Sequence, residues 1–269
     1  MNKINDVVHD IHHMNAMSTK DNWINQIHPL SKLIVVLCYI TIVMSFHKYE
    51  ILGLASMSSY LIILAIAGEI SLILSLKQTK FVLMLLCVVG IANPFLDHSY
   101  YTELAGIEIT GGVVSMATLM LKGVLAVLAS YFLIITTSME KLCYALRMIH
   151  IPKSFVTLIL LIYRYIIVLL KEVERITQAY HLRAPNHKGI HIKVWGSLVG
   201  QLLIRSIDRA QIVYESMLLR GYDGEFKEYQ NITFGYKSVL YLIFWLILFI
   251  SFRFFSIFEI VGNLAAGLI

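Results

Sequence analysis

Two arginine residues have the surroundings expected of a hydrogen-bonding anchor in a docking surface. Arg183 lies within His181–Ala184, and Arg220 lies within Leu218–Gly221. Taken alone, each has a simpler structural interpretation, because a cation in the last turn of a helix gains about 0.3–1 kcal/mol from the helix dipole. Gly221 likewise suits the position just after a helix. The arrangement occurs twice, each time with apolar neighbours at an exposed helix end, and this favours a docking surface in which arginine supplies the hydrogen bonds.

Residues that could hold a metal ion or catalyse a reaction are few. The candidate metal ligands are His9, Asp10, His12 and His13, all in the polar N-terminal arm. An arm of this kind is more often simply solvated, and nothing indicates a rigid second shell, so we expect no metal site. The chain has no Gly-Lys dipeptide and hence no phosphate-binding loop, and it has neither Gly-x-Ser-x-Gly nor His-Glu-x-x-His. We therefore expect a chain that is not an enzyme by itself.

The composition places these residues in a membrane protein. Of the 269 residues, 58% are hydrophobic and 14% are charged, and the mean hydropathy is +0.74. A soluble domain has about a quarter of its residues charged, so this chain cannot cover a water-facing surface and much of it must face lipid. The apolar runs are long and lack strict alternation, which predicts helices rather than a membrane barrel.

Five stretches have the length and apolar character of a membrane span. They are Leu30–Phe46, Ile51–Gly68, Phe81–Phe95, Gly112–Thr136 and Tyr236–Ile257. The third is short and ends at Asn93-Pro94, so we expect it to be tilted or broken. The predicted organisation is an N-terminal arm at 1–29, four spans in 30–136, a polar region at 137–232, and a final span with a short tail at 233–269.

The basic residues give the orientation of these spans. Lys77 and Lys80 lie between the second and third spans, and Lys141, Arg147 and Lys153 follow the fourth. By contrast, the segment 96–111 between the third and fourth spans has acidic residues but no Lys or Arg. The N-terminus and the region 137–232 are therefore expected on the cytoplasmic side of the membrane.

The apolar run Phe155–Leu170 is ambiguous, because Arg164 lies at its centre. Both of its flanks look cytoplasmic, and a crossing would place them on opposite sides of the membrane. An arginine at mid-bilayer is also costly. We therefore interpret the run as the apolar first half of a long helix, buried against the bundle or another subunit. The alternative is a sixth span with Arg164 paired inside the bundle, since hydropathy alone does not separate buried from spanning helices.

A short amphipathic helix is predicted directly after the fourth span. Thr137 and Glu140 have the spacing of a capping box, in which each side chain accepts a hydrogen bond from the other residue's backbone N–H. Apolar residues follow at helical spacing up to Ile149. Pro152 then ends this helix and opens the next.

Two long helices are predicted after the short one. The first runs over Ser154–Arg183 and is stopped by Pro185, and the second runs over Ile190–Arg220 and is stopped by Gly221. Each has about 30 residues and a length of about 45 Å. The predicted fold class is an all-α integral membrane protein of about five transmembrane helices, with these three cytoplasmic helices between the fourth and fifth spans.

The last of these helices carries residues that resemble a known family. The stretches Arg205–Ala210, Tyr214–Met217 and Arg220–Gly224 resemble the CbiQ branch of the EcfT family, the transmembrane (T) components of energy-coupling factor transporters. Further similarity lies in Pro29–Leu33, Ile151-Pro152 and Tyr163–Tyr165. The resemblance extends from about Asn25 to Gly224, and Arg209–Gly224 is its most specific part.

The resemblance implies roles for the helix ends. Family members carry an Ala-Arg-Gly motif at the tips of two coupling helices, and the corresponding residues here are Leu182–Ala184 and Leu219–Gly221. Both arginines are retained, whereas the first motif lacks its glycine and both lack the alanine. The implied ATPase-docking residues are Arg183, Ala184, Arg220 and Gly221. The implied supporting residues of the coupling helices are Arg164, Arg205, Asp208 and Arg209.

The resemblance also implies partners and a cargo. Two cytoplasmic ABC ATPase subunits would bind ATP and Mg, and each would hold one helix tip. A separate membrane substrate-capture (S) component, such as a CbiM-like protein, would bind the cargo. In the CbiQ branch that cargo is typically cobalt ion for cobalamin synthesis, with nickel or a vitamin as alternatives. This chain would carry no cofactor and bind no nucleic acid.

A stand-alone secondary transporter or channel is the alternative function. That class places polar or charged residues along its own path near mid-membrane. The predicted spans contain few such residues, chiefly Lys122 and Arg253. A membrane-embedded transferase would need carboxylates clustered at one membrane face, and only scattered ones are present.

Overall fold

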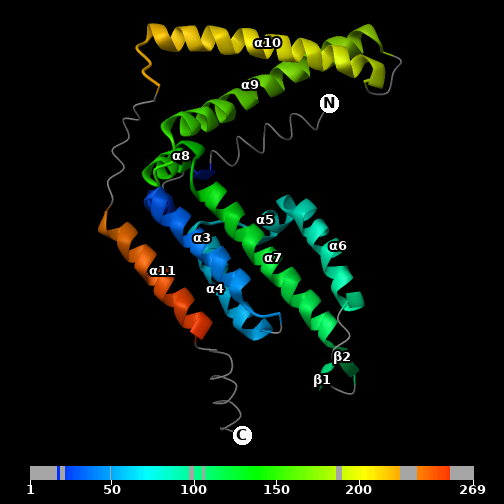
Figure 1. Cartoon of the computed structure of the whole chain (residues 1–269), viewed down its shortest axis with the longest axis vertical. Coiled ribbons are helices and arrows are strands. Elements are labelled where there is room, and N and C mark those ends of the chain that lie inside the picture. Colours follow the sequence, from blue (N-terminus) through cyan, green and yellow to red (C-terminus); the bar gives the residue numbers. More distant parts are fainter. Residues whose placement is uncertain are drawn as a thin grey trace. The chain divides into compact units, whose positions relative to one another are not determined.

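A computed structural model describes residues 17–18, 22–48, 50–96, 100–104, 107–185, 190–224 and 235–254 (Figure 1). The chain divides into two compact units. We call Met17–Ser138 with Ile232–Ile269 the bundle unit, and Met139–Asn231 the arm unit. The candidate metal ligands of the N-terminal arm, His9, Asp10, His12 and His13, lie outside the described residues.

The described residues are almost entirely helical, which confirms the predicted all-α class. The bundle unit contains α2 (Trp23–Gln26), α3 (Pro29–Ser45), α4 (Ile51–Ala67), α5 (Leu72–Gln78), α6 (Lys80–Leu96), β1 (Tyr100–Leu104), β2 (Ile107–Thr110), α7 (Gly111–Thr136) and α11 (Tyr236–Phe254). The arm unit contains α8 (Met139–Met148), α9 (Lys153–Arg183) and α10 (Ile192–Leu219).

Three local features of the bundle unit differ from the sequence-based expectation. The loop before α7 contains an antiparallel hairpin in which Glu103 lies opposite Glu108. The second span is followed by α5, and the two helices are bent by 107° where Gly68 and Glu69 end α4. Of the two expectations for the third span, tilted or broken, the break at Asn93-Pro94 is wrong, because α6 continues to Leu96 with Pro94 inside it.

Length and composition single out three described helices that could each cross a membrane, namely α7, α9 and α11. The bent pair α4–α5 would be a fourth if it is one span, whereas α3 and α6 are shorter apolar helices. α9 is one continuous helix of 31 residues whose apolar first half contains Arg164. By its length and composition, α9 could therefore be the sixth span of the alternative topology.

Aromatic residues from α3, α4 and α11 form the centre of the bundle unit. Tyr39, Tyr60 and Phe249 are fully buried, and the Tyr39 ring centroid lies 4.8 Å from that of Tyr60 and 5.3 Å from that of Phe249. Trp245 packs edge-on against Tyr60 at 4.6 Å. The Tyr39 hydroxyl donates to the Met57 carbonyl oxygen at 3.1 Å. Aromatic pairs of this kind add to the free energy of area burial, so they fix the three helices together.

Two lysines connect α3 and α7 in a reciprocal way. Lys32, only 3% exposed, donates from the first turn of α3 to the carbonyl oxygen of Thr136, the last residue of α7, at 2.7 Å. Lys122, from the middle of α7, donates to the carbonyl oxygens of Met44 and Phe46 at the end of α3. Each helix C-terminus has carbonyls without intrahelical partners and a partial negative charge. Each lysine therefore caps the other helix.

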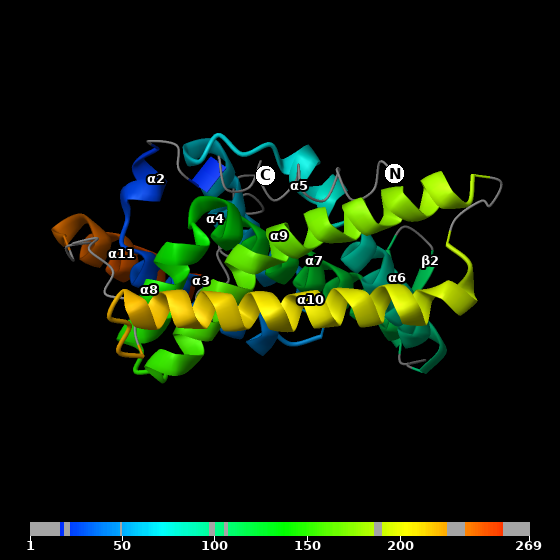
Figure 2. The same ribbon diagram turned by 90° about the horizontal axis from the view of Figure 1, so that it is seen from above.

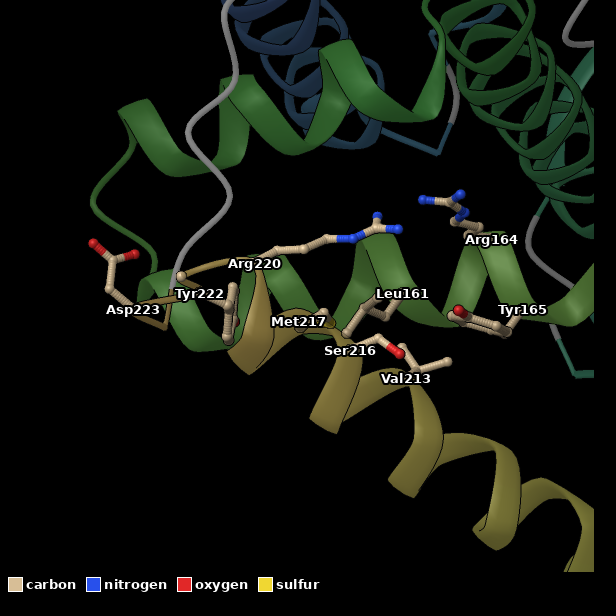
Figure 3. Close-up of a pocket in the computed structure, with 10 residues that line it drawn as sticks. Leu161, Arg164, Tyr165, Val213, Ser216, Met217, Arg220, Tyr222 and Asp223 are labelled. Carbon is tan, nitrogen blue, oxygen red and sulfur yellow. The ribbon is translucent and has the colours of Figure 1, made fainter.

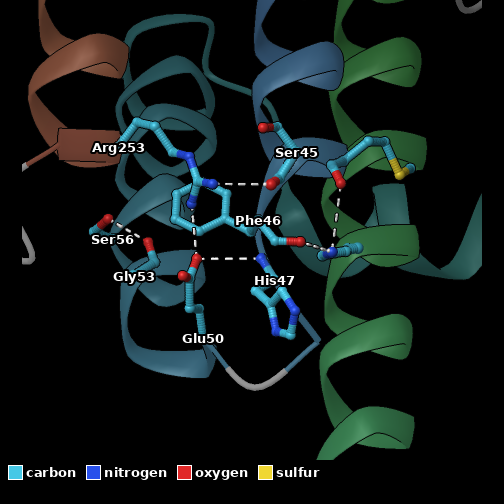
Figure 4. Close-up of polar contacts among 9 residues, drawn as sticks. Ser45, Phe46, His47, Glu50, Gly53, Ser56 and Arg253 are labelled. Carbon is cyan, nitrogen blue, oxygen red and sulfur yellow. Dashed lines mark hydrogen bonds and ion pairs between the residues drawn. The ribbon is translucent and has the colours of Figure 1, made fainter.

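Arg253 of α11 binds the same end of α3 (Figure 4). Its guanidinium donates to the Glu50 carboxylate at 2.7 Å and to the Ser45 carbonyl at 3.0 Å, and it lies over the Phe46 ring at 4.6 Å from the centroid. Partial burial raises the pKa of Glu50, but the His47 backbone N–H and the Arg253 guanidinium outweigh it and hold the pKa below its usual value. Arg253 is thus bound within the bundle unit.

The predicted capping box before α8 is wrong. α8 begins at Met139, so Ser138 rather than Thr137 immediately precedes it. The Thr137 hydroxyl is buried and has no hydrogen-bond partner. A side chain one position too early does not reach the free N–H groups of the first turn.

Candidate functional site

The end of α10 has a defined capping geometry. Gly221 has φ of +78°, its N–H donates to the Leu218 carbonyl at 2.9 Å, and the Tyr222 N–H donates to the Met217 carbonyl at 3.0 Å. This pair of bonds is the Schellman motif, which needs a left-handed residue after the C-cap and therefore favours glycine. Arg220 is the C-cap, so the motif fixes the backbone that carries its side chain. The sequence predicted this role for Gly221 correctly.

The end of α9 is built differently. Ala184 has φ of −133°, and its N–H donates to the Tyr180 carbonyl at 3.0 Å as a continuation of the helical pattern. Pro185 then stops the helix because it lacks an N–H. No left-handed residue is needed, which explains why this tip lacks the glycine of the other. Arg183 is exposed, and the neighbouring Leu182 is 84% exposed.

The two tips lie at opposite ends of the helix pair. α9 and α10 run in opposite directions and are inclined to each other (Figures 1 and 2). Arg220 and Arg164 line one cavity, whereas Arg183 lies 19 residues after Arg164 on α9. At 1.5 Å per residue, the Arg164 and Arg183 positions are about 28 Å apart along the helix axis.

The cavity at the α10 tip brings two guanidinium groups together. It has a volume of about 520 Å³, and its lining includes Leu161, Arg164 and Tyr165 from α9 and Met217, Arg220 and Tyr222 from the end of α10. Figure 3 shows the Arg220 side chain extended toward Arg164 along one side of the cavity. Sequence reasoning assigned both arginines to coupling helices but did not place them together, because 55 residues separate them in the chain.

Side chains along the helices hold α9 and α10 in this arrangement. Arg205 of α10 forms an ion pair with Glu172 of α9, and Arg209 lies over the Tyr165 ring at 5.9 Å from the centroid. Near the other end, the His191 N–H donates to the Tyr180 hydroxyl at 3.4 Å. Arg205 and Arg209 thus each join α10 to α9, and their role in supporting the coupling helices stays a prediction. Asp208 is exposed on α10. Glu172, the partner of Arg205, was not predicted, and only its position in a charged segment pointed to it.

The arm helices also present much apolar surface. A groove of about 710 Å³ runs between Ser154–Leu169 of α9 and Ser206–Tyr222 of α10. None of the residues of α10 is buried. Large apolar side chains that are exposed on the two helices are Phe155, Leu158, Ile162, Ile166, Leu182, Ile192, Trp195, Val199, Leu203, Ile204, Ile207, Ile212, Leu218 and Leu219. An apolar surface of this extent is typical of an interaction site.

Within the described part of the chain, no three His, Cys, Asp or Glu residues lie close enough together to hold a metal ion. The two charges noted in the spans, Lys122 and Arg253, both bind the end of α3.

Comparison with known proteins agrees with the resemblance of the motifs. Residues 20–232 match the family model CbiQ, described as cobalt transport protein. An uncharacterized protein of Methanocaldococcus jannaschii is 36% identical over 127 residues, which are 46% of this chain and 45% of that protein. The energy-coupling factor transporter transmembrane protein EcfT of Listeria innocua is 25% identical over 219 residues, 76% of this chain and 82% of that protein.

A third relative joins two proteins in one chain. The fused cobalt transport protein CbiMQ of Methanocorpusculum labreanum is 33% identical over 120 residues, 44% of this chain and 20% of that protein. The chain thus matches less than half the length of the M. jannaschii relative and a fifth of the fused one. Since the family model covers most of the sequence, including both arginine-bearing tips and the groove between α9 and α10, this integral membrane protein belongs to the CbiQ cobalt transport protein family of EcfT-type transmembrane components.

Proposed function

We propose that the chain is the transmembrane coupling subunit of an energy-coupling factor importer. One observation carries this proposal: a single pair of long helices bears exposed arginines at two opposite tips, and an apolar groove lies between the two helices. Two rigid helices transmit a movement better than loops do. The tips would bind two ATPase subunits, and the apolar surface would bind a membrane subunit that captures the substrate.

The proposal places the arm unit in the cytoplasm. The second half of α9 and the part of α10 from Arg205 onward carry charged side chains, including the Arg205–Glu172 pair, that need water. Because both flanks of the apolar first half of α9 look cytoplasmic and Arg164 lies at its centre, this half would lie against partner subunits or the bilayer surface rather than cross it. Cysteines introduced near Glu103 and near Lys188 should then react with impermeant reagents from opposite sides of the membrane. Labelling from one side only would contradict this topology.

We further propose cobalt ion as the cargo and a CbiM-like protein as the capture subunit. The family description and the name of the fused M. labreanum relative support both. ATP and Mg would be bound by the ATPase subunits, and this chain would be non-catalytic and without a cofactor. Radiolabelled cobalt uptake by the reconstituted complex tests the cargo. Uptake of nickel or a vitamin in place of cobalt would correct the cargo.

Charge reversal at the tips tests the coupling role. In co-expression with an ATPase pair, Arg183→Glu and Arg220→Glu should each weaken retention of the ATPase by the tagged chain, and the double variant should abolish it. All variants should remain in the membrane. Lys171→Glu, an exposed reversal on α9, is the matched control and should retain the ATPase.

Two outcomes would overturn the proposal. Undiminished retention of the ATPase by the double variant would remove the arginine anchors. Substrate uptake into vesicles by this chain alone, without an ATPase, would favour the stand-alone transporter.

A further inference from the structure

The cavity at the α10 tip contains one more arginine than the coupling motif requires. Arg220 belongs to the motif, whereas Arg164 comes from the first half of α9 and faces the same space (Figure 3). Arg183 lies at a tip that lacks a second arginine among the described residues nearby. The two tips of the helix pair therefore differ in charge and in shape.

The two guanidinium groups have no carboxylate partner among the described residues. Asp223 also lines the cavity, but its carboxylate points away from both arginines in Figure 3. Like charges brought together repel, and an anion between them removes this repulsion. By contrast, Arg205 on the same helix pair is neutralised by Glu172. Among the described residues, the Arg164–Arg220 pair is thus a cationic site without a bound carboxylate.

The walls of the cavity indicate the kind of anion. Leu161 and Met217 are apolar, and the rings of Tyr165 and Tyr222 lie beside the arginines. An apolar wall suits a small anion carried on a polypeptide and excludes water around it, which strengthens charge-assisted hydrogen bonds. A planar guanidinium binds a planar carboxylate through two parallel bonds, and two guanidiniums can bind its two oxygens from different sides.

We infer that Arg164 is a second anchoring residue of the ATPase-docking site at the α10 tip, and that Arg164 and Arg220 together bind one Asp or Glu side chain of the ATPase. The inference rests on the proposed coupling function. It assigns to Arg164 a direct contact with the partner rather than a role within the helix pair. It also makes the two docking sites unequal, with two arginines at the α10 tip and one at the α9 tip.

Binding of the purified ATPase pair to the full-length chain in lipid nanodiscs tests the inference. Arg164→Glu should weaken binding about ten- to a hundredfold, and Arg164→Gln should weaken it less, as expected for a lost charge-assisted contact. Arg164→Lys should recover part of the affinity, because it keeps the charge but not the fork. Lys171→Glu, seven residues later on the same helix face, should bind as the unchanged protein does.

A double-mutant cycle separates a shared carboxylate from two independent contacts. If both arginines bind one group, the losses in Arg164→Gln and Arg220→Gln should be strongly non-additive. Losses in Arg164→Gln and Arg183→Gln, at opposite tips, should add. A thermal midpoint equal to that of the unchanged protein would show that Arg164→Gln keeps the helix pair intact.

The outcomes distinguish this inference from the proposed function. If Arg220→Glu loses the ATPase while Arg164→Glu and Arg164→Gln bind normally, the second anchor is refuted and the coupling role stands. If all three arginine reversals bind normally, the coupling role itself fails. Additive losses at Arg164 and Arg220 would overturn the shared carboxylate.

Discussion

The bundle unit and the arm unit use their cations in opposite ways. In the bundle unit, Lys32, Lys122 and Arg253 each donate to the carbonyls at a helix C-terminus. In the arm unit, Arg164 and Arg220 are exposed and lie without a carboxylate among the described residues. The difference teaches that these bundle-unit cations are used to cap helix ends within the unit, whereas Arg164 and Arg220 are left exposed, as the proposed docking role requires.

Apolar side chains show the same contrast. Tyr39, Tyr60 and Phe249 are fully buried in the bundle unit, whereas α10 buries none of its residues and Leu219 is 91% exposed. Helical stability in proteins comes mostly from packing of an apolar face. The α9–α10 pair therefore leaves much apolar surface unpacked, and the proposed docking of a partner would cover part of it.

The largest expected effect on stability distinguishes the two units directly. Phe249→Ala should lower the free energy of unfolding by about 3–5 kcal/mol, because it opens a cavity in the aromatic centre. Leu219→Ala is the matched change at an exposed apolar position and should alter stability by less than about 0.5 kcal/mol. Thermal or denaturant unfolding in detergent measures both. Equal effects of the two changes would contradict the contrast in packing.

Lys32→Met should cause the next largest loss in the free energy of unfolding. The change keeps the length of the side chain but leaves the Thr136 carbonyl without its donor, which costs about 1–3 kcal/mol for a buried acceptor. Lys171→Met, an exposed lysine on α9, serves as the control and should leave the unfolding midpoint unchanged. A midpoint of Lys32→Met equal to that of the control would show that the cap of α7 contributes nothing.

Lys122→Met tests the other half of the reciprocal caps. Lys122 is only half-buried, so water can replace part of its role and the expected loss is about 1 kcal/mol. Lys32 and the Lys122 contacts lie at opposite ends of α3, so the losses in Lys32→Met and Lys122→Met should add within about 0.5 kcal/mol. Strong non-additivity in the double variant would indicate that α3 and α7 separate as one step.

The smallest expected effect is the pH dependence of the Glu50–Arg253 pair. The pKa of Glu50 is lower in the folded protein than its usual value, so the pair stabilises the fold above about pH 4.5 and loses this contribution as the pH falls through the lowered pKa. The pair is partly exposed, so its contribution is about 0.2–1 kcal/mol. The unfolding midpoints of the unchanged protein and Glu50→Gln should converge on acidification. A constant difference between pH 3.5 and 7 would contradict the assignment.

The sequence was most informative where the structure depends on local chemistry. Helical periodicity and the residues Pro152, Pro185 and Gly221 predicted the bounds of α9 and α10 to within two residues. The role of Gly221 was predicted because the Schellman motif involves only neighbours in the chain. The hairpin before α7 and the sharp bend after α4 were not predicted, because no strong turn or strand pattern marks them in the sequence.

The contacts between residues far apart in the chain could not be predicted from the sequence. The partner of Lys32 is 104 residues away, and that of Lys122 is 76 residues away. Both acceptors are backbone carbonyls, which every residue has, so no side-chain type identifies them. The meeting of Arg164 and Arg220 depends in the same way on how α9 and α10 cross.

In this arrangement, α9 carries a contact residue for each of the two docking sites, and the length of this helix has a mechanical consequence. The Arg183 and Arg164 positions are about 28 Å apart on α9. If the two subunits bound at these positions moved relative to each other by about 5 Å, perpendicular to the helix axis, α9 would tilt by about 10°. A membrane partner seated in the groove along the first half of α9 would turn with the helix. The helix would then act as a lever that converts a relative shift of the two bound subunits into a rotation of the membrane partner.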